Sequence, residues 1–181
     1  MRILPMLFTT LSLIAVAGDH PAARDVAPLT PAQIHTLLTS PLRHVRAVDA
    51  RAARVIAEGL RGSRTFAHLV AALDHTDVIV YVETVTTLPA SLSGRMLLSA
   101  APRGPRYVRV QVQAYLHPKE IVAALGHELV HALEVSQDPE VTDDASLVRL
   151  YERIGLGGKG TTHFDTIAAQ NAGRRVRSEL L

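Results

Sequence analysis

The sequence predicts an α+β fold in which helices flank a small mixed sheet. Two changes in the hydrophobic period carry this prediction. Residues 45–73 place apolar side chains at helical spacing, whereas residues 78–113 hold short apolar or alternating runs that are typical of strands. Helical spacing returns after Pro118 and continues to the C-terminus with short breaks. The chain has 181 residues and no cysteine, so we expect one domain that depends on its core and has no disulfide.

The first 17 residues are typical of a secretory signal peptide. Arg2 precedes an apolar stretch that ends in Ala15-Val16-Ala17, which matches the positive start, apolar middle and small-residue end of such signals. This stretch is shorter than the roughly 20 residues needed to cross a bilayer, so no stable membrane anchor is expected. We therefore expect cleavage near Ala17 and export to the periplasm or the medium. Residues 18–30 are predicted to form a flexible lead-in, and residues 31–181 a single domain.

Helix signals recur on both sides of the strand region. Thr30-Pro31 resembles a helix start, with threonine as the cap and proline at the first helical position. Ser63 is placed to cap a helix that runs through Leu73. The predicted helices cover residues 45–60, 63–73, 118 to about 137, 145–154 with Gly155 after it, and 164–181.

Three segments are predicted to be strands. Residues 78–82 form a continuous apolar run, as in a strand buried on both faces, and residues 95–101 form a second candidate. Residues 106–113 alternate, with Val108, Val110 and Val112 on one face and polar side chains on the other. One buried face and one solvent-exposed face predict that this last strand lies near the sheet edge.

The most informative motif is His127-Glu128-Leu129-Val130-His131, within the predicted helix after Pro118. Residues four positions apart share a helix face, so the two imidazoles point the same way and can bind one zinc ion. Glu128 lies between them and is positioned to act on a zinc-bound water. The flanking residues are uncharged, which suits a dry site. They are Leu125, Leu129, Val130, Ala132 and Leu133.

Charge and aromatic content argue against a nucleic-acid partner. The 19 basic and 17 acidic residues give a net charge of only +2, and aromatic residues make up 4% of the chain. A protein that binds nucleic acid usually has a basic patch and often aromatic side chains that stack on bases. The arginines between positions 43 and 64 are spread along predicted helix faces, which is typical of a solvated surface.

With this motif the chain resembles the zincin superfamily of metallopeptidases. The match to the extended zincin signature covers Ala124 to Leu133, and the order of strand, motif helix and C-terminal helix is similar over residues 76–181. In this wider region the chain resembles short gluzincin-like bacterial exported proteins. The resemblance implies zinc bound by His127 and His131, Glu128 as the general base, and a peptide or protein substrate.

The third zinc ligand is less well defined by the sequence. The metzincin pattern needs a glycine and a histidine soon after the second histidine, and residues 134–141 contain neither. A downstream carboxylate is therefore expected. Asp165 is preferred because its surroundings resemble the glutamate helix of gluzincins, although Thr162 and Asp165 also form a capping-box pattern. Glu152 is the runner-up, and it also has the character of a solvated acid beside arginines.

Two further roles are predicted around the motif. Glu134 lies on the same helix face as the histidines, and we expect it to hydrogen-bond a histidine and orient that ring without binding the metal itself. His163 and Tyr151 are candidates for the donor that stabilises an oxyanion, but each is also typical of a loop or core residue.

Together these features predict a zinc-dependent peptidase, with strand 106–113 pairing with an extended substrate. The alternative is a catalytically inactive zincin-like domain that serves binding or structure in the exported compartment.

Overall fold

The computed structural model describes residue 32 and residues 43–99, 104–157 and 164–180. Over these residues the chain forms a four-stranded mixed sheet and five helices, so the α+β prediction is confirmed. The predicted signal peptide, the lead-in and the Thr30-Pro31 helix start lie outside the described residues, apart from Ala32. None of the helices in the described part is both long and apolar enough to cross a membrane.

Along the chain, two helices follow the first strand, and three helices follow the last three strands. The motif helix is the first of these three. The elements are β1 (Val45–Ala47), α2 (Ala50–Gly62), α3 (Arg64–Leu73), β2 (Val78–Val85), β3 (Gly94–Ser99), β4 (Arg106–Gln113), α4 (Pro118–Gln137), α5 (Asp144–Ile154) and α6 (Ile167–Glu179).

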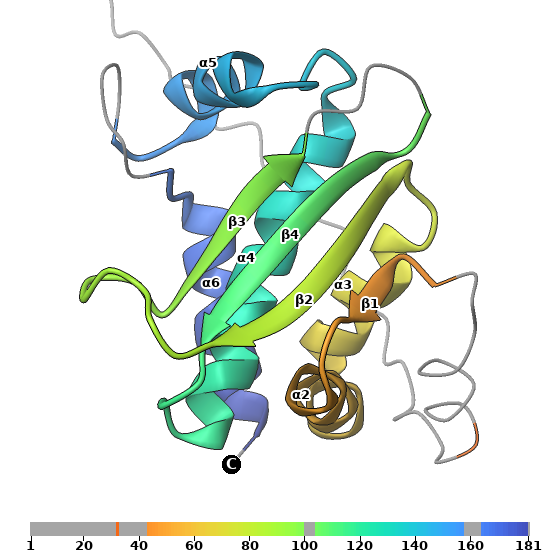
Figure 1. The fold of residues 1–181 in the computed structure, drawn as a ribbon, viewed down its shortest axis with the longest axis vertical. Coiled ribbons are helices and arrows are strands. Elements are labelled where there is room, and N and C mark those ends of the chain that lie inside the picture. Colours follow the sequence, from red (N-terminus) through yellow and green to blue (C-terminus); the bar gives the residue numbers. More distant parts are fainter. Residues whose placement is uncertain (1–31, 33–42, 100–103, 158–163, 181) are drawn as a thin grey trace, which may run out of the picture.

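Helices cover one face of the sheet, and none of the described elements covers the other, which is called the open face (Figure 1). Val108, Val110 and Val112 of β4 are at most 1% exposed and belong to the same core as Leu125 and Leu129 of α4. On the open face, Tyr81 stacks on Tyr107 of the adjacent strand. The alternating pattern of β4 is therefore the pattern of a sheet covered on one side.

The position of β4 corrects the predicted edge strand. The strand order is β1-β2-β4-β3, so β4 lies between a parallel neighbour and an antiparallel one. The edge strand beside α4 is β3. Alternating apolar and polar residues indicate that one face of a strand is exposed to solvent. They do not indicate whether the strand has one neighbour or two. The polar groups of the open face also bond to one another, since Gln111 donates to Glu83.

A second correction concerns residues 45–47, which were predicted as the start of a helix. They form β1, which pairs in parallel with β2 through Val45 and Val80. A strand of three residues is too short to show a period, so the helical spacing that follows it dominated the prediction. Asp49 separates the two elements, because its carboxylate accepts from Arg51 N and Ala52 N and caps α2.

The other helix boundaries agree with the predictions to within about three residues, the usual uncertainty of helix ends. Ser63 accepts from Phe66 N as the N-cap of α3, and Gly155 ends α5. Pro118 begins α4. The last helix starts at Ile167, with Thr166 as its N-cap, and not at residue 164.

Arg106 ties the start of β4 to the C-terminal end of α4. Its side chain is 5% exposed, and its guanidinium forms a two-armed ion pair with Asp77, with two nitrogens at 2.8 Å from the carboxylate oxygens. The same group donates to the carbonyl oxygens of Val135, Asp138 and Val141. Val135 lies in the last turn of α4, and Asp138 and Val141 follow its end, so a single buried cation binds the chain where the helix ends and fixes it to the sheet.

Replacing Arg106 with alanine should lower the free energy of unfolding by about 3 kcal/mol, because it leaves Asp77 without its ion-pair partner and removes the buried donor that three carbonyls share. Arg109→Ala is the matched control, since Arg109 lies on the same strand with 57% of its side chain exposed. Its effect should stay within about 0.5 kcal/mol. Urea unfolding followed by circular dichroism measures both. Equal losses in the two variants would contradict the role given to Arg106.

The hydrogen bond and charge of Arg106 hold the pKa of Asp77 below its ordinary value. A lowered pKa means that the folded state favours the carboxylate. This stabilisation is therefore complete above the unfolded pKa of about 3.9 and is lost as pH falls through the folded value.

Candidate metal centre

Helix α4 brings the two histidines of the motif together. His127 and His131 are one turn apart on an uninterrupted helix, and their Nε2 atoms are 3.1 Å apart. The rings meet edge to face, with centroids 4.8 Å apart. Two nitrogens that approach this closely cannot both carry a proton, so the pair is arranged to share a proton or a cation.

Asp165, just before α6, completes a group of three potential ligands. Its Oδ1 lies 3.5 Å from His127 Nε2, and one ligand atom from each of the three residues lies within 4.8 Å of the others. The carboxylate accepts from Thr166 N and from Gln170 Nε2, both at 2.7 Å. The structure thus brings together the two histidines and the preferred third residue.

The alternative reading of Asp165, a capping box with Thr162, does not match the helix that forms. Thr162 lies outside the described residues, and α6 begins two residues after Asp165. Thr166 is the N-cap, with its hydroxyl accepting from Ala169 N at 3.1 Å. The carboxylate of Asp165 is therefore not the N3 acid of a capping box for α6 and faces His127 instead.

Glu134 makes the histidine hydrogen bond expected of it. Its Oε2 lies 2.8 Å from His131 Nδ1, and its side chain is 11% exposed. The same carboxylate accepts from Thr166 Oγ1 at 2.6 Å and from Tyr151 Oη at 3.3 Å. With Nδ1 bonded to a carboxylate, Nε2 of His131 is left to face His127 and Asp165.

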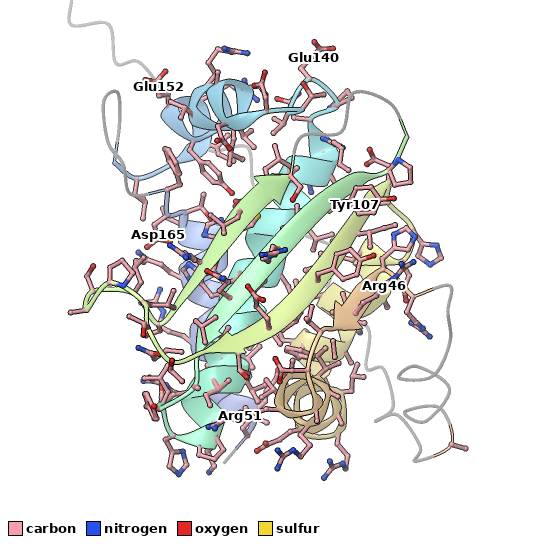
Figure 2. All side chains as sticks on the ribbon, viewed as in Figure 1. Arg46, Arg51, Tyr107, Glu140, Glu152 and Asp165 are labelled. Atoms are coloured by element: carbon pink, nitrogen blue, oxygen red, sulfur yellow. The ribbon has the colours of Figure 1, made fainter. Side chains whose placement is uncertain are left out.

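The remaining predicted residues lie elsewhere or act differently. Glu152 is not part of the three-residue group in the described structure, and Figure 2 shows it on α5, apart from Asp165. Tyr151 is buried with its ring against His131, at a centroid distance of 5.4 Å. Its hydroxyl donates to Glu134 and helps to position that carboxylate, and Tyr151 also lines the cleft, so its role as an oxyanion donor stays a prediction. His163 lies outside the described residues.

Glu128 is buried beside this group. Burial is the main cause that raises the pKa of its carboxyl to about 7. Gly94 of β3 faces it so closely that a Cβ there would lie 3.0 Å from Cγ and Oε1 of Glu128. A carboxyl held between a helix and a strand, with a pKa near neutrality, has the properties of a general base.

The pKa values of the two histidines are shifted in opposite directions. Burial, followed by the charge of His131, lowers the pKa of His127. Burial also acts to lower the pKa of His131, but the hydrogen bond to Glu134 and the charge of Glu128 outweigh it, and the pKa of His131 is raised. A metal cation bound here would interact with all three residues at once.

The group opens into a cleft of about 950 Å³. Its floor is α4, one wall is β3 with the preceding residues 89–93, and the other wall is α6. Helix α6 lies close to α4 because Gly173 faces Ala123 O, where a Cβ would lie at 3.3 Å. The motif helix is therefore accessible from one side along most of its length.

Several residues of this site were not predicted. Gln170 and Thr166 hold Asp165 and Glu134, yet neither stands at a spacing that marks it in the sequence. Gly94 did carry a signal, since a glycine at the start of a predicted strand often marks the close approach of another group. Gly173 interrupts a helical pattern, which can indicate tight helix packing.

Comparison of the chain with protein-family models, with curated proteins and with solved structures gave no match. The resemblance to zincins therefore rests on the motif, and the interpretation of the site rests on the geometry described above.

If Asp165 is the third ligand, Asp165→Ala should weaken zinc binding by more than the roughly 10- to 100-fold typical of losing an outer-shell partner. Glu152→Ala is the matched control and should leave zinc affinity unchanged. Competition with a chromogenic chelator measures both. The opposite result, with affinity lost in the Glu152 variant alone, would transfer the third ligand to α5.

Proposed function

We propose that this protein is a zinc-dependent peptidase. The observation that carries the proposal is the three-residue group of His127, His131 and Asp165 beside a buried carboxyl, Glu128, at the floor of an open cleft. Each part has a function in amide hydrolysis: metal binding, proton transfer and substrate access. The mechanism needs all three within a few ångströms.

The donor set fits zinc. Two imidazole nitrogens and one carboxylate oxygen are ligands that zinc accepts, and catalytic sites use three protein ligands and keep one position open. Two nitrogens bound tetrahedrally at ~2.05 Å are about 3.3 Å apart. The His127–His131 and His127–Asp165 separations of 3.1 and 3.5 Å are close to this value. Glu134 supplies the outer carboxylate that zinc-binding histidines commonly have.

The ion would supply Lewis acidity, which polarises a substrate carbonyl and makes a water molecule acidic near neutral pH. Glu128 would accept the proton from that water as it attacks the carbonyl carbon. The same carboxyl would then donate the proton to the leaving amine, so that Glu128 is unchanged after one turnover. Its buried position beside the histidines keeps this proton from bulk solvent.

The substrate would lie as an extended strand along β3. This replaces the earlier expectation for strand 106–113, because β4 already has neighbours on both sides. β3 pairs only with β4 in the described sheet, so its outer edge offers main-chain groups to a peptide. Gly94, at the start of β3, approaches Glu128. A peptide on this edge would therefore pass the general base. The predicted signal peptide would direct this activity outside the cytoplasm.

Glu128→Gln should retain zinc and lose about 10²- to 10⁴-fold in kcat/KM, because an amide of the same shape cannot accept the proton. Elemental analysis of the purified protein measures the metal, and hydrolysis of a quenched fluorescent casein measures activity. Wild-type protein without metal, even after incubation with zinc, would rule out the proposal. Bound zinc with no hydrolysis in either protein would favour the alternative, a binding or structural domain.

Gly94→Ala should lower kcat by about tenfold and leave zinc affinity unchanged. The added methyl would meet Glu128 at 3.0 Å, so the carboxyl must shift by a few tenths of an ångström, whereas the ligands are not touched. Ser99→Ala is the control, on the same strand at an exposed position. If both variants keep full activity, the position of Glu128 does not depend on Gly94.

A further inference from the structure

The cleft has different charge at its two ends. Apolar side chains lie at the end near α5: Met96, Leu147, Tyr151 and Phe164. The other end lies between the N-terminal half of α4 and the C-terminal half of α6, where Arg174 and Arg177 line the wall. The acids Glu128 and Asp165 lie between these two ends, at the candidate metal centre.

Arg174 is the cation of this wall that lacks an acidic partner. Arg177 forms an ion pair with Glu120. Arg95, which lines the facing wall from β3, also has a neutral partner, since it donates to Gln111 on the open face of the sheet. Arg174 donates to the neutral Asn171 at 2.7 Å, and no ion pair joins it to an acid within the described residues. Its charge is therefore available to a ligand in the cleft.

Strand direction determines which part of a substrate would meet Arg174. β3 starts opposite Val112 and ends opposite Tyr107, next to Arg106, which binds the C-terminal end of α4. β3 thus runs from the Arg174 end of the cleft toward α5. A peptide paired antiparallel to β3 runs the other way, so its C-terminal part reaches Arg174. Antiparallel pairing is also the slightly more stable arrangement.

We infer that the cleft selects peptides with a carboxylate on the C-terminal side of the scissile bond, bound by Arg174, and apolar residues on the N-terminal side. This position relative to the bond rests on the proposed function, whereas the charge preference does not. The carboxylate has two sources, an acidic side chain or the free C-terminus of the peptide. A guanidinium binds either of them through two parallel hydrogen bonds.

Fluorescence anisotropy with labelled peptides tests the inference without hydrolysis. The protein is the full chain with Glu128→Gln, measured with and without added zinc. The peptides are apolar in their N-terminal half and carry Glu or Gln at successive positions of the C-terminal half, with an amidated end. A third set has Gln throughout and a free C-terminal carboxylate. We expect about tenfold tighter binding of the peptides with a carboxylate.

Arg174→Glu and Arg175→Glu form a matched pair. They make the same charge change at adjacent positions of α6, where both side chains are exposed, but only Arg174 lines the cleft. The preference for a carboxylate should disappear or reverse in Arg174→Glu and persist in Arg175→Glu. Equal binding of Glu and Gln peptides to the parent, or equal loss in both variants, would overturn the inference.

The two proposals can fail separately. If the wild type cleaves none of these peptides but the preference depends on Arg174, the carboxylate site stands and the peptidase proposal fails. If the wild type cleaves Glu and Gln peptides at equal rates and binds them equally, the peptidase proposal stands and the inference on Arg174 fails. The cleavage position, read by mass spectrometry, tests the predicted direction of the peptide.

Discussion

The carboxylate of Glu134 connects the elements on which the candidate site depends. It accepts from His131 on its own helix, from Tyr151 on α5 and from the Thr166 hydroxyl at the start of α6. A largely buried charge is tolerated only when such partners surround it, so each of these three elements is held where it can reach Glu134. One of the partners, Thr166, is the N-cap of α6 and follows Asp165 directly. The position of Asp165 beside His127 is thus linked to the orientation of His131.

The sheet places the other side of the site. Helix α4 lies across the covered face, and Arg106 fixes its C-terminal end to β4 and Asp77. β3 lies beside β4 as an edge strand, with Gly94 against Glu128. Because α6 packs closely on the same helix through Gly173, the histidines lie at the bottom of a cleft between β3 and α6. The contact with Gly94 of the sheet therefore positions Glu128, the general base that we propose, whereas contacts between the helices position the proposed ligands.

Sequence reasoning succeeded where a feature depends on neighbours along the chain. The one-turn spacing of His127 and His131 follows from helix geometry, and the bond between Glu134 and His131 follows from their spacing of three residues. It failed where a feature depends on strand order. Residues 106–113 alternate because one face of the sheet is open, and the same pattern would arise at an edge or in the centre. β1 was missed because three residues show no period of their own.

The sequence by itself determined the α+β class, most helix boundaries and the three motif residues on one helix, because period, caps and spacing are local properties. Only the tertiary structure decided that Asp165, and not Glu152, faces the histidines. The position of either residue relative to α4 depends on how the helices pack, and not on its separation from α4 along the sequence. It also decided that β3 is an edge strand of the described sheet and that Arg174 lines the cleft without an acidic partner among the described residues. Such relations arise from contacts between segments far apart in the chain, which a hydrophobic pattern does not encode.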